Sequence, residues 1–387
     1  MEQWKEYRLG EICKVINGRA YKQDELLNEG KYKVLRVGNI FQGNKWYYSD
    51  LELPDSKYCY NGDLLYAWSC DFAPYIWHGD KTIYHYHIWK LEENKDVVDR
   101  QYLYYYLQIR TKTFLGGTHG SVMLHMTKKD MEDQILSLPS LSSQKRIASI
   151  LSSLDDKIAL NRKINSNLEE QAKALFKSWF IDFEPFKDGK FVDSEFGMIP
   201  ERWNMMSFES FISESQDKAM VGTYPAYSVT NNGITPRTEK FKKQLSKATS
   251  KEKILRKNDL VFGMSRQILN WGIMQDEIGS VSSAYHVYKI DKERTCPTYL
   301  RYFIKGYESY FRDLIGTAAR EGQSLDKGAL MNKKLLVPSK EILRSFIQHV
   351  TTIENTISLF KSQCRRLSTL RDTLLPRLMS GEIEVRS

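Results

Sequence analysis

The sequence predicts an α+β protein with two similar domains of mixed helix and strand, separated by two long helices. The first observation behind this prediction is an internal repeat. Residues 86–91 return as residues 285–290 at an offset of 199, and residues 61–65 match residues 257–261 at an offset of 196, which indicates a small deletion. The segments between these matches differ, so two copies of one scaffold carry different loops.

The second observation is a heptad pattern at the end of each copy. From Ile147, and again from Phe346, apolar residues recur at alternating steps of four and three. A period of 3.5 residues held for about five heptads indicates a coiled-coil seam. Neither helix can bury such a stripe alone, so we expect the two to pack together. The predicted seam is Ile147, Leu151, Leu154, Ile158, Asn161, Asn165, Leu168 and Leu175, then Phe346, Val350, Ile353, Ile357, Phe360, Leu367 and Leu374.

Local signals bound the helices and interrupt the seam. A Pro-Ser pair precedes each helix, and serine caps a first helical turn. The first helix is expected to end near residues 180–185 and the second at Gly381, because glycine ends helices. Asn161 and Asn165 form either a tolerated polar layer or a device that selects the register of the pair. Arg371, in the second seam, is expected to reach toward solvent.

The two globular domains are expected at residues 1–140 and 200–338. A helical spacer and linker follow the first at 141–199, and a C-terminal helical spacer covers 339–387. In each domain, short β-like runs precede a helical stretch, which is typical of an α+β domain. The β-like runs are residues 32–37, 63–68, 82–91, 259–264 and 284–290, and the helical stretches are residues 100–112 and 298–314.

The composition favours a polyanionic partner. The 387 residues carry a net charge of +9 together with 23 Tyr and 8 Trp. Cations neutralise phosphates, while aromatic and amide groups meet bases and sugars. Five dispersed cysteines without a Cys-x-x-Cys pair indicate reduced thiols, and no apolar run reaches the roughly 20 residues needed to cross a bilayer. The N-terminus lacks the layout of a secretory signal, so we expect a cytoplasmic protein.

A search for catalytic motifs favours a protein that recognises a target over an enzyme. The sequence contains neither a phosphate-binding P-loop nor a Gly-x-Gly-x-x-Gly turn after a strand, and the Asn/Asp-Pro-Pro-aromatic signature of amino-methyltransferases is absent. Residues 155–157 (Asp-Asp-Lys) are interpreted as a solvated charge cluster. His85 and His87 share a face of a predicted strand, and a half-buried strand with polar tips is preferred to a metal site that would include His78. No catalytic residue, metal or cofactor is therefore expected on this chain.

Three segments resemble one known family. Residues 175–183 (LFKSWFIDF), 197–203 (GMIPERW) and 374–383 (LLPRLMSGEI), within the duplicated layout, are similar to the specificity subunit of type I restriction–modification systems of bacteria and archaea. The resemblance implies that each domain is a target-recognition domain reading half of a bipartite, asymmetric DNA site, and that the helices form an antiparallel coiled coil. It also implies two modification subunits that methylate adenine with S-adenosylmethionine, and two restriction subunits that use ATP and Mg²⁺.

Geometry supports that arrangement. An antiparallel pair of equivalent helices carries an internal pseudo-two-fold symmetry, so it presents two equivalent domains to one face of a duplex. Successive major grooves on one face lie about 34 Å apart. A helix of roughly 39 residues is nearly 60 Å long, which spans that gap.

Candidate DNA-binding residues lie in turns and loops. Arginine pairs with guanine, asparagine and glutamine pair with adenine, and glycine-rich loops approach phosphates closely. In the first domain the candidates are Arg19, Tyr21, Lys22, Arg36, Asn39, Thr118, His119 and Ser121. In the second they are Thr230, Asn231, Asn232, Ser265, Arg266, Gln267, Asn270, Arg320 and Gln323, with Arg266 as the first choice.

Two alternatives remain open on the sequence. A freestanding sequence-specific DNA-binding scaffold or regulator has the same charge and the same coiled coil, but no enzyme partner. A catalytic nuclease is the weaker alternative, because no acidic cluster accompanies Asp155.

Overall fold

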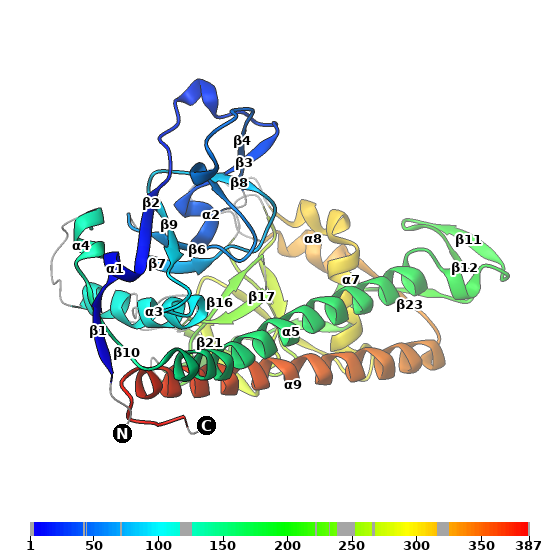
Figure 1. Ribbon diagram of the computed structural model, residues 1–387. Coiled ribbons are helices and arrows are strands. Elements are labelled where there is room, and N and C mark those ends of the chain that lie inside the picture. Colours follow the sequence, from blue (N-terminus) through cyan, green and yellow to red (C-terminus); the bar gives the residue numbers. More distant parts are fainter. Residues whose placement is uncertain are drawn as a thin grey trace. The chain divides into compact units, whose positions relative to one another are not determined.

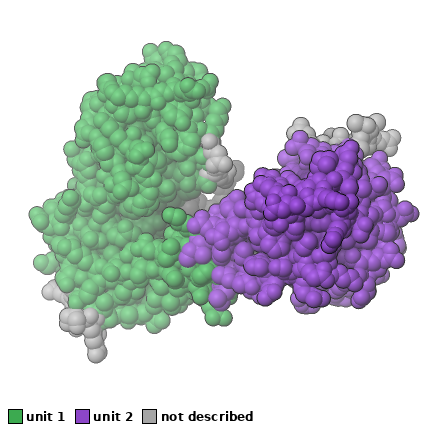
Figure 2. Space-filling model, turned by 90° about the vertical axis from the view of Figure 1, so that its right-hand side faces the viewer, with its two compact units in different colours: residues 1–163, 360–387 green, residues 164–359 purple. Residues whose placement is uncertain are grey.

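The chain forms two compact units. The computed structural model describes residues 4–41, 43, 45–69, 72–116, 126–220, 223–231, 233–237, 252–264, 268–315 and 325–385. Unit 1 comprises residues 1–163 and 360–387, and unit 2 comprises residues 164–359 (Figures 1 and 2). Both units combine strands with helices, as the predicted α+β class requires.

Unit 1 contains two four-stranded sheets among its described residues. Its short helices are α1 (Leu9–Ile12), α2 (Val37–Phe41), α3 (Arg100–Gly116) and α4 (Lys128–Glu132). Its strands are β1 (Lys5–Arg8), β2 (Cys13–Asn17), β3 (Tyr32–Leu35), β4 (Tyr47–Ser49), β5 (Tyr58–Cys59), β6 (Leu64–Ala67), β7 (Ala73–Ile76), β8 (Thr82–Tyr84), β9 (Ile88–Glu93) and β10 (Ile135–Leu138). The sheet orders are β2-β9-β6-β7 and β4-β3-β8-β5, and β1 pairs with β10.

Unit 2 contains a matching four-stranded sheet and several smaller ones. Its short α-helices are α7 (Pro297–Gly306) and α8 (Lys327–Asn332). Its strands are β11 (Phe191–Ser194), β12 (Gly197–Pro200), β13 (Asn204–Ser207), β14 (Ile212–Glu214), β15 (Lys218–Ala219), β16 (Tyr227–Thr230), β17 (Gly233–Pro236), β18 (Glu252–Arg256), β19 (Leu260–Phe262), β20 (Trp271–Ile273), β21 (Ile278–Ser282), β22 (His286–Ile290) and β23 (Lys334–Val337). The four-stranded sheet has the order β14-β22-β19-β20, and β13 pairs with β23.

The two units repeat one topology. Lys5 lies opposite Leu138 in the β1–β10 pair, and Asn204 lies opposite Val337 in the β13–β23 pair, so both partners recur at an offset of 199. The strand order of the unit 2 sheet also matches the β2-β9-β6-β7 order of unit 1. The duplication seen in the sequence is therefore a duplication of fold.

Inside the domains the offset is smaller than the sequence match indicated. Leu64 lies opposite Leu91 in unit 1, whereas Leu260 lies opposite Tyr288 in unit 2, so β9 and β22 correspond at an offset of 197 (288 against 91). The first residues of α3 and α7, numbers 100 and 297, also differ by 197. A shift of two positions keeps every side chain on its own face of a strand, so a hydrophobic pattern does not distinguish an offset of 197 from one of 199.

Two long helices cross from one unit into the other. These helices, α5 (Leu141–Phe180) and α9 (Lys340–Met379), have 40 residues each. At 1.5 Å per residue each is about 60 Å long. The serine oxygens accept hydrogen bonds in the first turns, Ser140 from the Ser143 backbone N–H at 3.3 Å and Ser339 from the Ile342 N–H at 3.4 Å. Gly381, with φ of 75°, follows the end of α9.

The two helices pack side by side and antiparallel (Figure 1). In unit 1, Asp155 contacts Arg371 at 2.6 Å and Asn161 contacts Gln363 at 3.2 Å, so the partner number in α9 falls as the number in α5 rises. In unit 2, the end of α5 packs on the beginning of α9, where the Phe180 and Phe346 ring centroids lie 4.8 Å apart. The predicted antiparallel coiled coil is confirmed.

The predicted seam faces inward. Its apolar members are buried or half-buried, and none of them is exposed. Asn161 and Asn165 are buried as well. Arg371 is not buried, as expected, and its side chain stays partly exposed while it forms ion pairs with Asp155 and Asp372.

The structure differs from three expectations about local structure. Residues 82–91 do not form one strand, because a turn at 85–87 separates β8 from β9. Residues 298–314 form α7 and then a 3-10 helix, Glu308–Leu314. In the predicted solvated cluster, Asp156 and Lys157 are exposed as expected. Asp155 differs, because it is half-buried and its two carboxylate oxygens are engaged by the Tyr105 hydroxyl and by Arg371.

Each unit has its own main hydrophobic core. The core of unit 1 joins α3 to both long helices through residues such as Leu103, Leu151 and Leu375. The core of unit 2 joins α7 to both long helices through Phe303, Phe180 and Phe346. Among the described helices, none combines the length and the apolar character needed to span a membrane.

Candidate nucleic-acid interface

Three backbone segments of unit 1 converge at His85. The Arg19 N–H donates to the Tyr84 carbonyl at 3.1 Å, and the His85 N–H donates to the Leu35 carbonyl at 2.9 Å. A Cβ at Gly18 would lie 2.3 Å from the His85 carbonyl oxygen, so only glycine allows this approach. Candidates that are far apart in the sequence, Arg19 and Arg36, are therefore brought to the same end of the sheet.

The residues after the first turn are partly engaged. Arg19 donates from Nη1 and Nη2 to the two carboxylate oxygens of Glu25, at 2.9 and 2.6 Å. Its guanidinium also lies 5.1 Å from the centre of the Tyr21 ring. Lys22 is exposed. Because Glu25 neutralises Arg19, Lys22 is the freer cation of this group.

The loop after β3 carries the second group. Asn39 accepts from the Arg36 backbone N–H at 3.0 Å and donates to the Lys45 carbonyl at 2.9 Å. Both ends of the Asn39 amide are thus used within the chain, which makes it a support for the loop more than a reader of bases. Arg36 is exposed, and its guanidinium lies 5.3 Å from the centre of the Tyr47 ring.

Sequence reasoning missed four further residues of β3, β4 and the segment between them. The Lys45 ammonium lies 5.1 Å from the centre of the Tyr47 ring, and the Lys33 ammonium lies 5.5 Å from the centre of the Trp46 ring. Lys33, Arg36 and Lys45 are exposed, and among the described residues none of them forms an ion pair with a carboxylate. We name Lys33, Arg36, Lys45, Trp46 and Tyr47 the basic–aromatic patch. It covers both faces of this sheet edge, because Trp46 packs with Leu35 and Tyr47 packs with Val34. The Lys-Trp-Tyr run at 45–47 could have indicated these residues in the sequence, because it places a cation next to two large aromatic rings.

An aromatic cluster lies beside this patch. The His85 ring centroid lies 4.4 Å from that of Tyr86 and 4.8 Å from that of His87. Burial, followed by the neighbouring His87 and Arg36, lowers the pKa of His85 to about 4. His85 is therefore neutral near pH 7. In the part of the chain that the structure describes, no group of three or more His, Cys, Asp or Glu side chains is placed to hold a metal ion.

In unit 2 a hairpin and a loop lie together. Thr230 and Asn231 stand at the turn between β16 and β17, and Asn231 is exposed. Asn270, which precedes β20, donates to the Met264 carbonyl at 2.6 Å. A Cβ at Gly263 would lie 3.1 Å from Val229 and 3.5 Å from Asn270, so the hairpin and the loop are adjacent.

The remaining candidates lie outside the described residues. They belong to the segments 117–125, 232, 265–267 and 316–324, and they are Thr118, His119, Ser121, Asn232, Ser265, Arg266, Gln267, Arg320 and Gln323.

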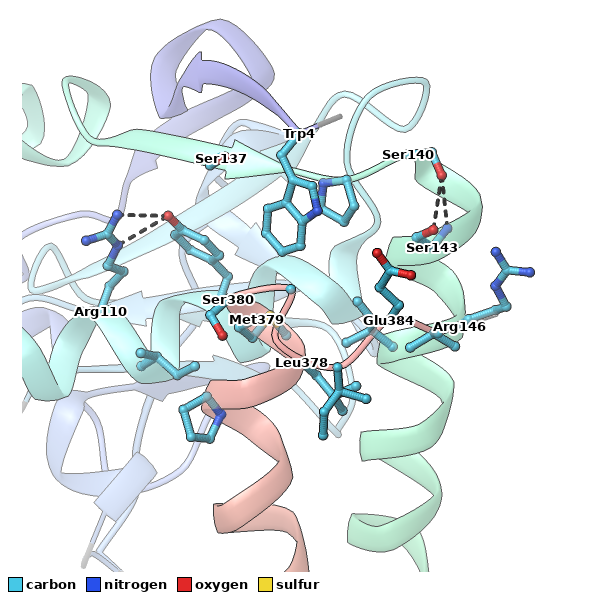
Figure 3. A pocket seen from close by; sticks show the side chains of 18 residues that line it. Trp4, Arg110, Ser137, Ser140, Ser143, Arg146, Leu378, Met379, Ser380 and Glu384 are labelled. Atoms are coloured by element: carbon cyan, nitrogen blue, oxygen red, sulfur yellow. Dashed lines mark hydrogen bonds between the residues drawn. The ribbon is translucent and has the colours of Figure 1, made fainter. Parts of the chain in front are cut away.

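Unit 1 also contains a cavity of about 730 Å³ between its chain ends (Figure 3). Trp4, the beginning of α5 and the residues after α9 form its walls. Arg110 turns toward the Tyr106 hydroxyl, to which it donates at 3.0 Å (Figure 3). A Cβ at Gly381 would lie 3.0 Å from the Trp4 ring. The two ends of unit 1 therefore pack closely against each other beside this cavity.

Comparison with known proteins gives a consistent result. Residues 1–170 match the family described as type I restriction modification DNA specificity domain. The specificity subunit of the type I restriction enzyme MjaVIII of Methanocaldococcus jannaschii is 25% identical, over 100% of this chain and 94% of the relative. The HindI specificity subunit of Haemophilus influenzae is 25% identical, over 99% of this chain and 100% of the relative.

A solved structure has the same fold. The S subunit of a type I restriction–modification system from M. genitalium superposes with a TM-score of 0.59 at 13% identity, covering 97% of this chain and 96% of that one. The long helices and the duplicated domains thus recur together in a known architecture.

Proposed function

We propose that the chain is a specificity subunit of the type I restriction–modification family and that it reads a bipartite, asymmetric DNA site for its partner enzymes. Residues 1–140 and 200–338 would be the two target-recognition domains, each reading one half-site. Residues 141–199 and 339–387 would hold them at a set distance. Recognition is the role of a specificity subunit, and the chemistry would reside on other chains.

The basic–aromatic patch is the observation that supports DNA contact by unit 1. Lys33, Arg36 and Lys45 present three charges without carboxylate partners among the described residues, and each lies on an aromatic ring. Phosphates bind such cations with the release of counterions. The rings of Trp46 and Tyr47 restrain the flexible side chains, which lowers the entropy lost on binding.

Two equivalent leucines support a duplicated partner surface. Leu160 of α5 is 50% exposed and Leu359 of α9 is 57% exposed, and their numbers differ by 199, so they occupy the same position of the repeat. Singly exposed apolar residues are common on protein surfaces, but an exposed leucine at the same position of both copies is what a duplicated contact would require. We propose that each docks one modification subunit, which supplies S-adenosylmethionine, and that two restriction subunits supply the ATP- and Mg²⁺-dependent cleavage.

The test is methylation mapping. The chain is co-expressed with its modification subunit in a host without adenine methylation, and methylated adenines are mapped by single-molecule sequencing. We expect one adenine in each half of a split site. Replacement of Lys33, Arg36 and Lys45 by glutamine should lower methylation strongly, whereas Lys31→Gln is the matched control because Lys31 already pairs with Glu52.

A freestanding regulator is the alternative. It would bind a specific site alone and would not co-purify with a methyltransferase. Specific binding without any methylation in the co-expressing host would therefore support the regulator and contradict our proposal.

A further inference from the structure

The two units share one polar contact between a domain helix and a long helix. In unit 1 the Tyr105 hydroxyl of α3 donates to Asp155 Oδ2 of α5 at 2.7 Å. In unit 2 the Tyr302 hydroxyl of α7 donates to Glu354 Oε1 of α9 at 3.0 Å. Each contact lies within its own unit. It joins the domain helix, α3 or α7, to a long helix, α5 or α9.

The two contacts occupy equivalent positions. The numbers of Tyr105 and Tyr302 differ by 197, as do those of the first residues of α3 and α7. The numbers of Asp155 and Glu354 differ by 199, as do those of the first residues of α5 and α9. The contact is therefore duplicated although the acid differs in length.

An arginine also pairs with each carboxylate, from the opposing long helix in unit 1 and from the domain helix itself in unit 2. Arg371 Nη1 of α9 lies 2.6 Å from Asp155 Oδ1, so the first contact joins three helices. Arg301, which precedes Tyr302 on α7, pairs with Glu354. These arginines do not lie at equivalent positions of the repeat, and only the tyrosine–carboxylate pair is common to both units.

The environment favours a strong and directional bond. Tyr105 is fully buried and Tyr302 is half-buried. Burial raises the pKa of both phenols, and the neighbouring carboxylates raise it further, so both remain hydrogen-bond donors. Hydrogen bonds to a charged group are shorter and about twice as strong as those between neutral groups. Such a bond resists rotation of the domain helix on the long helix, beyond what apolar packing provides.

We propose that Tyr105 and Tyr302 are positioning residues that set the angle of each recognition domain on its long helix, and thereby the spacer length that the protein accepts. This inference rests on the proposed function. One base pair added to the spacer moves the next half-site by about 3.4 Å and turns it by about 35°. The protein can reject a spacer that is one base pair too long only if its domains are held at a defined angle.

The experiment uses the full complex of this chain with its modification subunits. Methylation rates are measured on duplexes with the native spacer and with spacers one base pair longer or shorter. Tyr105→Phe and Tyr302→Phe each remove one hydroxyl and leave the ring. We expect each to reduce the ratio of native to altered-spacer rates on the order of tenfold, as the loss of one hydrogen bond to a charged group implies. The rate on the native spacer should change less.

Two controls separate positioning from stability. Tyr106→Phe removes a hydroxyl from the same helix α3, but that hydroxyl accepts from Arg110, which also belongs to α3, so spacer discrimination should persist. Asp155→Asn retains an acceptor for Tyr105 while it loses the charge, so an intermediate ratio is expected. Thermal unfolding of each variant shows whether a change in ratio accompanies a loss of stability.

The outcomes distinguish this inference from the proposed function. Unchanged ratios in both tyrosine variants, with a wild-type complex that methylates a split site, would overturn the positioning role alone. A wild-type complex that methylates no split site would overturn the proposed function, and the positioning role with it.

Discussion

Asn161 of α5 donates from Nδ2 to Oε1 of Gln363 in α9 at 3.2 Å, within the seam between the two helices. The Oδ1 atoms of Asn161 and Asn165 are buried, and neither finds a hydrogen-bond partner among the described residues. A buried acceptor left without a partner costs about 1–3 kcal/mol. Of the two interpretations of this layer, register control explains such a cost, because a polar pair is satisfied in only one alignment.

The first prediction concerns this layer. Replacing Asn161 and Gln363 by leucine should raise the unfolding temperature, since the buried polar atoms become apolar contacts worth about 1–3 kcal/mol. The same variant should broaden the distance distribution between spin labels at the exposed positions 157 and 369, because the register is no longer selected. Calorimetry and pulsed electron resonance measure the two effects. A less stable variant with one sharp distance would contradict the register interpretation.

The second prediction concerns the basic–aromatic patch. Lys45→Ala should weaken DNA binding at every sequence tested and lower the salt dependence of log K by about one unit, as the loss of one phosphate contact implies. Titrations at several salt concentrations measure the slope. Tyr47→Leu should weaken binding with little change of slope, because it removes the ring and no charge. If Lys45→Ala leaves the slope as in the wild type, Lys45 does not meet a phosphate.

The third prediction concerns Gly381. Its φ is +75°, and a Cβ there would lie 3.0 Å from the Trp4 ring. Gly381→Ala should therefore lower the free energy of unfolding by at least about 1–2 kcal/mol, the cost of a left-handed backbone for alanine. Urea denaturation measures the change. Gly38→Ala is the matched control, because no atom lies within 4 Å of a Cβ at Gly38. Equal stability of the two variants would argue against the packing of Trp4 on Gly381.

The fourth prediction concerns pH. Burial lowers the pKa of His85 from 6.5 to about 4, so between these values the unfolded chain binds more protons than the folded one. The free energy of unfolding should therefore fall as the pH is lowered from about 6.5 to about 4, and the contribution of His85 should be constant above that window. His85→Gln should reduce this slope in denaturation curves recorded from pH 4 to 8. His78→Gln, at an exposed position outside the 85–87 turn, serves as the comparison. A slope unchanged by His85→Gln would assign it to other groups.

The fifth prediction concerns the duplicated leucines. Leu160→Glu should release one of two modification subunits and Leu359→Glu the other, because a carboxylate in an apolar contact is left without a partner. Native mass spectrometry of the complex gives the stoichiometry. Leu370→Glu is the control, because Leu370 is also exposed but its repeat equivalent is Gln171. Retention of two modification subunits by both variants would place the docking surface elsewhere.

Much of the fold could be predicted from the sequence, but less of the candidate site. The helix entrances at Ser140 and Ser339 and the stop at Gly381 depend on neighbouring residues, so local patterns sufficed for them. Arg36 was found because an arginine beside a turn is conspicuous in a sequence. Lys33 and Lys45 were missed, because their roles depend on rings that the β3–β4 pairing brings near.

The sequence by itself determined the duplication, the two long helices and the apolar seam between them. These are properties of periodicity along one chain, and periodicity is visible without coordinates. Only the tertiary structure decided that β9 and β22 correspond at an offset of 197 and that Asp155 is held by Tyr105 and Arg371. The reason is physical: a shift by two positions leaves the pattern of a strand unchanged, and a carboxylate joined to groups 50 and 216 residues away has no local signature.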